Sequence, residues 1–546
     1  MEIIATILVL ILSVVISGAI ARALPVPLPL PVVQIGLGAF LAAIADLKVE
    51  LHPDVFFLLF LPPLLFLDGW RIPKEGLLRD RETILALAFG LVVFTVLGLG
   101  FFIHWMIPAM PLAVAFALAA VISPTDPVAV SGIAARVPVP KRLMHVLEGE
   151  SLLNDASGLV CMRFAVAAAL TGAFSLVDAV GTFLWLATGG VAIGIGVTWG
   201  VTKVQEMVAR RIGEEVGAHI LVSLLIPFGA YLLADRLGCS AILAAVAAGI
   251  TMSYADQSRA GLASTRVNRT AVWDTLQFAA NGTIFVLLGE QIPDIIGDAS
   301  EAVSEADHFD PALLAIYVLA ITGMLALLRF VWAWVTLRFI LFRASRQSQR
   351  VRSPGWRLLA ATTLAGARGA VTLAGVLTLP LAMTDGAPFP ARELAVFLAA
   401  GVIVVSLLAA SIGLPFVLKG LKLPPEPSLQ EKEDRARVAA AEAAIKAVTR
   451  AQRAPDARYG DGELYTEAGA RVIEAYRLRI DGNTKTGDEA ERARAIDRVE
   501  RELRLSALRA ERDELFRLRR MREISEEQAR ELIREIDLLE THLTAS

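Results

Sequence analysis

Long apolar segments dominate the chain up to about residue 420, without the regular alternation of apolar and polar positions that marks a soluble fold. Ile3–Ile20 and Ile84–Phe102 are each close to the roughly 20 residues that a helix needs to cross a bilayer. The pattern predicts an all-α membrane protein with about thirteen transmembrane helices. Their expected extents are residues 3–20, 28–45, 54–69, 83–105, 111–130, 143–171, 177–202, 217–237, 239–254, 270–296, 311–342, 356–382 and 392–418.

Basic residues gather in alternate connecting segments, as expected of cytoplasmic loops. This alternation places the N-terminal end outside the cell and the C-terminal region in the cytoplasm. With an odd number of spans, spans one to six and eight to thirteen are inverted relative to each other if they are repeats, and inverted repeats are common in secondary transporters. The basic clusters are Arg71, Lys74, Arg79 and Arg81; Arg136, Lys141 and Arg142; Lys203, Arg210 and Arg211; Arg259, Arg266 and Arg269; Arg343, Arg346, Arg350 and Arg352.

Composition fits this picture, because 55% of the 546 residues are hydrophobic and charge becomes dense only after Leu418. We predict a transmembrane domain over residues 1–420 and a charged, helical cytoplasmic domain over residues 421–546. The last helix of that second domain is expected to begin at a capping box, Ser525–Gln528. Acidic and basic residues are interspersed there, which argues against nucleic-acid binding. Cys161 and Cys239 lie in apolar runs and read as buried side chains, and no cofactor is expected.

Helix breakers interrupt the fifth and twelfth spans, at the same ordinal place in the two halves. Val121–Val128 contains an acid, Asp126, between two prolines, and Thr362–Ala370 contains two glycines. Proline frees backbone carbonyls, and such breaks are tolerated at membrane depth only where protein or a water-filled cavity covers them. Freed carbonyls coordinate cations in broken-helix transporters. A plain proline kink would not explain the acid.

The sixth span carries a polar set in the middle of an apolar helix. Ser151 and Asp155 are four residues apart, as are Glu150 and Asn154, so the two pairs lie side by side on adjoining helix faces. An ionisable group inside a span is costly, at about 2.5 to 3.5 kcal/mol on insertion scales, and usually faces a cavity or a partner. Asp155 is therefore predicted to be functional.

Other charged residues also lie within the predicted spans. Arg368, in the broken twelfth span, is expected to pair with Glu150. Arg329 and Arg163 are read as structural partners or as side chains that reach an interface, and Glu290 lies close to an outer helix end. Asp68 is either an ordinary interfacial acid or an entrance residue for cations, and the sequence favours neither reading.

The motifs resemble those of the sodium/proton exchangers, in the bacterial branch of the monovalent cation/proton antiporter superfamily. The matching segments are Ser123–Val130, Glu148–Asp155, Phe285–Gly289 and Gly366–Ala370, over roughly residues 1 to 420. The resemblance implies an inverted-repeat fold in which the broken fifth and twelfth spans cross, and a homodimer with a mobile core part.

The resemblance also implies roles for individual residues. Asp155 would bind both the proton and the cation, with Asp126, Ser151 and the Thr125 carbonyl as further sodium ligands. Glu150 would pair with Arg368. Because Asn154 precedes Asp155, where electrogenic relatives carry two adjacent aspartates, the resemblance implies electroneutral exchange.

The chemistry agrees with this reading. An aspartate in water has a pKa of about 3.9, too low for proton exchange near neutral pH, but a dry site penalises the ionised form and a bound cation offsets the penalty. Oxygen donors suit a hard cation such as Na+, and Li+ and K+ remain alternatives. A K+/H+ antiporter, a cation channel and an intramembrane aspartyl hydrolase using Asp126 and Asp155 also remain open at this stage, the last because two close carboxylates can share a proton.

Overall fold

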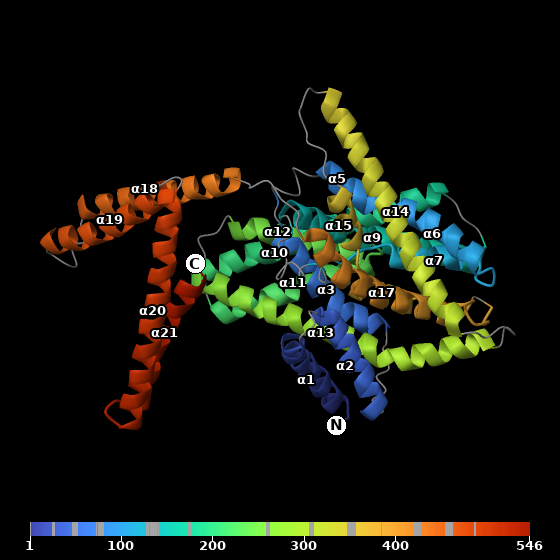
Figure 1. Cartoon of the computed structure of the whole chain (residues 1–546), viewed down its shortest axis with the longest axis horizontal. Coiled ribbons are helices and arrows are strands. Elements are labelled where there is room, and N and C mark those ends of the chain that lie inside the picture. Colours follow the sequence, from blue (N-terminus) through green and yellow to red (C-terminus); the bar gives the residue numbers. More distant parts are fainter. Residues whose placement is uncertain are drawn as a thin grey trace. The chain divides into compact units, whose positions relative to one another are not determined.

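The computed structural model describes residues 2–24, 28–45, 53–72, 74, 81–126, 130, 139, 141–172, 176–213, 215–257, 263–304, 311–346, 356–383, 385–419, 427–453, 462–484 and 488–545. Within these residues the regular secondary structure is helical, apart from one isolated bridge between Ala382 and Pro388. The chain divides into two compact units, Met1–Lys422 and Leu423–Ser546, which are called the membrane unit and the tail unit below (Figure 1).

The predicted apolar segments correspond closely to the helices of the membrane unit. Each expected extent falls on one helix or on a run of helices, while the number that crosses the bilayer stays a prediction. The helices are α1 (Glu2–Ala23), α2 (Leu30–Ala45), α3 (Pro53–Arg71), α5 (Arg81–Leu85), the π-helix η1 (Ala86–Leu91), α6 (Val92–Met106), α7 (Leu112–Ile122), α9 (Lys141–Thr171), α10 (Leu176–Ile212), α11 (Val216–Arg236), α12 (Ala241–Gln257), α13 (Ala263–Ser304), α14 (Pro311–Arg346), α15 (Trp356–Leu364), α16 (Ala370–Leu377) and α17 (Arg392–Leu418).

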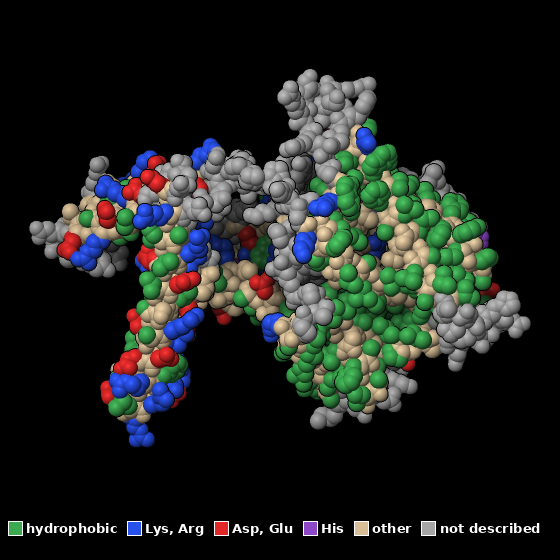
Figure 2. Space-filling model, viewed as in Figure 1, with side chains coloured by type: hydrophobic (Ala, Val, Ile, Leu, Met, Phe, Trp, Pro, Cys, Tyr) green, Lys and Arg blue, Asp and Glu red, His purple; other side chains and the backbone are tan. Residues whose placement is uncertain are grey.

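The outer surface of the membrane unit is apolar, as a lipid-facing surface must be. Among the described residues, eight helices are long and apolar enough to cross a membrane, and three shorter apolar helices accompany them. Large side chains such as Phe101, Trp199 and Leu225 are 58%, 61% and 65% exposed. Figure 2 shows the resulting hydrophobic face. Soluble proteins rarely expose so large an apolar surface to water, so the unit is a multi-pass membrane domain.

Glycine residues allow some neighbouring helices of the membrane unit to pack closely. A Cβ atom on Gly69 of α3 would collide with the backbone carbonyl of Val246 on α12, and one on Gly249 of α12 would collide with the carbonyl of Phe66 on α3. Small residues let helix backbones approach in this way within a membrane. The contact fixes the end of α3 that carries Asp68.

The interior of the unit is centred on α7 and α17. Residues 117–122 of α7 are all buried, and so are Leu398, Val402 and Ile403 of α17. Because α7 is short and enclosed, its end at Ile122 lies inside the protein and not at a surface. The following residues therefore meet other protein groups.

A π-helical segment, η1, supports the helix that carries the polar set. A π-helix leaves backbone groups of the ordinary helical ladder without their usual partners. The Ser157 hydroxyl donates to the Ala88 carbonyl over 2.7 Å, and the Trp332 indole N–H donates to the Ala86 carbonyl over 3.1 Å. These two bonds tie α9 and α14 to η1.

The tail unit consists of α18 (Pro427–Arg453), α19 (Gly462–Thr484), α20 (Asp488–Arg520) and α21 (Glu526–Ala545). The predicted capping box is confirmed, because the Gln528 N–H donates to the Ser525 hydroxyl and the Ser525 N–H donates to the Gln528 side chain, over 3.1 and 3.0 Å. Arg512 of α20 joins α21 through Asp537, at 2.7 Å, and Glu540. The hydrogen bond to Glu540 raises the pKa of the Arg512 guanidinium.

Candidate cation site

The two predicted helix breaks meet inside the membrane unit. The first lies after Ile122, where α7 ends, and the second lies between Leu364 and Ala370, where α15 ends and α16 begins. The Asp126 N–H donates to the Ala367 carbonyl over 2.8 Å, which joins the two breaks directly. The predicted crossing of the interrupted spans is therefore present in the fold.

Arg368 satisfies the carbonyl groups that the breaks set free. Its Nε atom donates to the Ile122 carbonyl over 2.9 Å, and its Nη1 atom donates to the Gly366 carbonyl. Its backbone N–H donates to the Ser406 hydroxyl of α17 over 3.1 Å. Arg368 is thus a structural support of the crossing, with 5% of its surface exposed.

A small acidic cavity lies beside the crossing. Its volume is about 40 Å³, enough for a small ion with little of its water shell. Three carboxylates line it, and none of the lining residues that the structure describes is basic, which favours a cation as the occupant. The lining residues are Leu61, Leu64, Leu65, Asp68, Pro124, Thr125, Asp126, Ser151, Asp155, Gln277, Asn281, Gly369, Val371 and Thr372.

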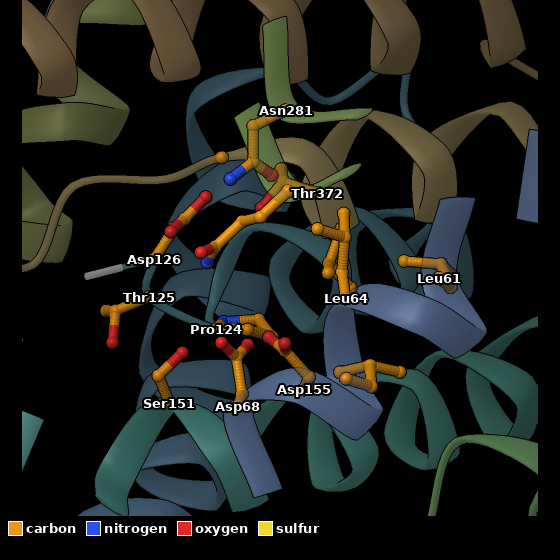
Figure 3. Close-up of a pocket in the computed structure, with 14 residues that line it drawn as sticks. Leu61, Leu64, Asp68, Pro124, Thr125, Asp126, Ser151, Asp155, Asn281 and Thr372 are labelled. Carbon is orange, nitrogen blue, oxygen red and sulfur yellow. The ribbon is translucent and has the colours of Figure 1, made fainter. Parts of the chain in front are cut away.

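Three parts of the chain bring the predicted ligands and Asp68 together (Figure 3). Asp155 and Ser151 lie one turn apart on α9 and are each only 7% exposed. Asp126 comes from the broken segment after α7, and Asp68 comes from the end of α3 and is exposed. Asp68 therefore lines the cavity from an exposed position, and its role as an entrance residue stays a prediction.

Thr125 and Asn154 belong to a hydrogen-bond chain behind the cavity. The Asn154 amide donates to the Thr125 hydroxyl over 3.0 Å, and that hydroxyl donates to Glu150 over 3.2 Å. The direction is fixed, because a carboxylate only accepts and the hydroxyl has a single proton to give. The chain holds the Asn154 side chain while Asp155, the next residue, faces the cavity.

The expected ion pair between Glu150 and Arg368 is wrong. Glu150 pairs instead with Arg329 of α14, whose Nη1 and Nη2 atoms lie 2.5 and 2.8 Å from the two carboxylate oxygens. Arg329 Nε also donates to the Thr362 carbonyl of α15 over 2.9 Å. The physical reason is that the guanidinium of Arg368 is held by the freed carbonyls of the break, while Arg329 of α14, which packs against α15, reaches Glu150.

Gly369 allows Asp126 to approach the break closely. A Cβ atom at this position would collide with the Asp126 carboxylate. Glycine is therefore required for space here, whereas the sequence suggested only that it interrupts a helix. The second break thus shapes the position of a carboxylate in the first.

Three polar lining residues were missed from the sequence: Gln277 and Asn281 of α13, and Thr372 of α16. Gln277 and Asn281 are four residues apart in a span and therefore share a face. That spacing is a usable signal, but it is weak, because a buried amide costs less than a buried charge.

Two other charged residues of the predicted spans, Glu290 and Arg163, lie away from this cavity. Glu290 is 4% exposed and accepts a hydrogen bond from the Gln291 amide over 2.7 Å. Arg163 is exposed and lines a second cavity of about 640 Å³, together with Tyr231 and Asp235 of α11. Leu61, Leu65 and Val371 line the small cavity and belong to an apolar cluster with Ile242, which lines the large one.

Known proteins resemble this chain in sequence and in fold. A family model described as "Sodium/hydrogen exchanger, transmembrane" matches residues 9–420. The uncharacterized Na(+)/H(+) exchanger YjcE of Escherichia coli strain K12 is 42% identical over 549 residues, covering 100% of this chain and 99% of that protein. The sodium, potassium, lithium and rubidium/H(+) antiporter of Bacillus pumilus strain SAFR-032 is 39% identical over 538 residues, covering 97% of this chain and 77% of that protein.

The fold is similar to that of a solved antiporter. The sodium proton antiporter MjNhaP1 from Methanocaldococcus jannaschii matches with a TM-score of 0.57 at 18% identity, over 77% of this chain and 99% of that chain. The family match spans nearly the whole membrane unit and includes both helix breaks. The chain therefore belongs to the sodium/hydrogen exchanger family, and it is a membrane antiporter of monovalent cations and protons, not an enzyme.

Proposed function

We propose that this antiporter exchanges one sodium ion for one proton, with Asp155 as the group that holds either. The observation that carries the proposal is the cavity lined by Asp68, Asp126 and Asp155 without a basic lining residue among those described. A cation entering this cavity replaces the positive charge that a proton would otherwise supply. Competition between the two for Asp155 then couples their movements.

The proposed ligand set consists of oxygen atoms alone. Asp155, Asp126 and Ser151 supply side-chain oxygens, and the Thr125 carbonyl is the backbone ligand. Hard alkali cations prefer such donors. The Thr125 hydroxyl is engaged by Asn154 and Glu150, which is consistent with a role for the carbonyl of that residue and not its side chain.

Alternating access is supported by the two cavities and the apolar layer between them. The layer of Leu61, Leu65, Ile242 and Val371 combines residues of α3 and α12 with a residue of α16, next to the break. Movement of the broken helices against α3 and α12 would open the site toward the large cavity. We place the large cavity on the outer side, with the N-terminal end outside and the tail unit in the cytoplasm.

Dimerisation and one-for-one stoichiometry complete the proposal. The homodimer follows from the resemblance, in which one part of each protomer stays fixed while the core moves. Asn154 in place of a second acid leaves one proton-exchanging carboxylate in the Asn154–Asp155 pair, which supports electroneutral exchange. The tail unit would regulate transport or support the dimer.

Ion selectivity extends beyond sodium in a relative whose printed name includes potassium, lithium and rubidium. We therefore include K+ and Li+ as candidate substrates. Membership of an exchanger family removes the intramembrane hydrolase that the sequence left open.

The experiment that tests the proposal uses purified protein in liposomes containing a trapped pH dye. Addition of Na+ should dequench the dye, while choline should not, and Li+ and K+ should give graded responses. Once Asp155 is largely protonated, the apparent KM for the cation should rise about tenfold for each unit by which the pH is lowered, because one proton competes with one cation. A KM independent of pH would contradict competition.

A further inference from the structure

A polar track connects the acidic cavity to the exposed end of α3. Asp68 and Arg71 lie about one turn apart at the end of α3, and Asp274, Gln277 and Asn281 follow the spacing of one face of α13. Asp274 is exposed, while Gln277 and Asn281 are partly buried and line the cavity. In Figure 3 Asn281 and Asp68 lie on opposite sides of the cavity that Asp126 and Asp155 line.

Arg71 connects the residues at the solvent-exposed end of this track. Its Nη1 atom donates to the Gln277 side-chain oxygen over 2.8 Å, and its Nη2 atom pairs with the Asp274 carboxylate. The side chains of Arg71 and Asp274 are 37% and 56% exposed, so the pair stands at the solvent end of the track. We call Arg71 and Asp274 the mouth ion pair.

The hydrogen bond to Gln277 has a direct chemical consequence. A guanidinium only donates, so the atom of Gln277 that faces it must be the carbonyl oxygen. That oxygen is the only atom of the side chain able to ligate a cation, and Arg71 withholds it from the cavity. The positive charge of Arg71 acts in the same direction, because it repels a cation approaching Asp68.

We propose that the mouth ion pair sets the affinity for the cation on the cytoplasmic side. Arg71 weakens cation capture, and Asp274 offsets that effect by neutralising Arg71. Both are positioning residues, since they act through Gln277 and through the local potential. This inference rests on the proposed sodium/proton exchange and on the cytoplasmic placement of the end of α3.

The test compares Arg71→Gln and Asp274→Asn in everted vesicles, where added Na+ meets the cytoplasmic face. Arg71→Gln should lower the apparent KM for Na+ about three- to tenfold, and Asp274→Asn should raise it by a similar factor. The double variant should lie between the two single variants, because the charges cancel while the Gln277 oxygen stays free, and Arg71→Lys should stay near the parent. Maximal rates should change little.

Two further readouts separate this role from a structural one. The shifts should shrink when choline chloride raises the ionic strength, because exposed charges are screened, and they should be absent in right-side-out vesicles. Lys203→Gln is the matched control, since Lys203 forms an exposed ion pair with Glu206 on α10, away from the cavity. Its KM should equal that of the parent.

The proposal is overturned if the two variants shift KM in the same direction, if neither shifts it, or if the shift appears equally or only in right-side-out vesicles. These outcomes require that the parent exchanges Na+ for protons and that Asp155→Asn does not. If the parent fails that requirement, the proposed function itself is wrong, and the mouth ion pair falls with it.

Discussion

Glu150 of α9 and Arg329 of α14 form a two-pronged ion pair deep inside the membrane unit, 2% or less exposed on either side chain. The pair stands directly behind the cavity, because Glu150 also accepts the hydrogen bond of Thr125. Arg329 reaches α15 as well, through the Thr362 carbonyl. One arginine therefore links α9, α14 and the first half of the broken span.

Removing one partner of this pair should destabilise the protein. Glu150→Gln leaves the charge of Arg329 uncompensated in the interior, at a cost of about 3 to 5 kcal/mol. The midpoint of thermal unfolding in detergent should fall clearly, as followed by intrinsic fluorescence. Replacing both residues by leucine should recover part of the loss. If the parent and Glu150→Gln were equally stable, the ion pair would not stabilise the fold.

Asp155→Asn should abolish exchange without unfolding the protein. The amide cannot bind and release a proton in this pH range, so the competition with a cation is lost. Dye dequenching should drop to the level of protein-free liposomes, while the thermal midpoint stays within a few degrees of the parent. Asp294→Asn, at an exposed position of α13, is the control and should transport normally. Robust exchange by Asp155→Asn would remove the central residue of the mechanism.

Gly369→Ala should impair transport through Asp126. The added methyl group would collide with the Asp126 carboxylate and displace it, and misplacement by about 1 Å can cost up to about 100-fold in rate. We expect a loss of about tenfold or more in sodium-dependent dequenching. The control is Gly196→Ala on α10, where a Cβ atom would meet nothing within 4 Å. Similar activity of the two variants would argue against a close fit at the break.

Exchange should be insensitive to the membrane potential if it is one for one. A potential of about 100 mV, imposed with a potassium gradient and valinomycin, is worth about 2.3 kcal/mol for each uncompensated charge. The initial rate with Na+ should be the same at zero and at this potential. A rate that follows the potential would mean that a second charge moves in each cycle.

The capping box of the tail can be tested by hydrogen exchange. Ser525→Ala removes the hydroxyl that accepts from Gln528, and loss of such a cap costs about 1 kcal/mol. Amides in the first turns of α21 should exchange about fivefold faster in the full-length protein. Thr544→Ala, at the other end of α21, serves as the control and should leave those turns unchanged. No difference between the variants would show that packing against α20 alone holds the helix.

Local patterns alone were enough to place the helices and to name candidate residues for the cavity. Some features depend only on residues a few positions away, so their structure can be predicted from the sequence. They are the apolar blocks, the proline-containing break at Asp126 and the capping box at Ser525. The position of Asp155 in the cavity wall follows the same logic, because a carboxyl group in an apolar helix is costly unless it faces a cavity or a partner.

What only the tertiary structure decided is which distant groups meet. Arg329 and Arg368 are both arginines inside predicted spans. The sequence and the family resemblance favoured Arg368 as the partner of Glu150, and no local pattern pointed to Arg329. The choice followed from the freed carbonyls of Ile122 and Gly366, which engage Arg368, and from the packing of α14 against the broken span. The same holds for Gln277. It lines the cavity because its face of α13 lies opposite the acidic residues, and the sequence does not show which face packs where.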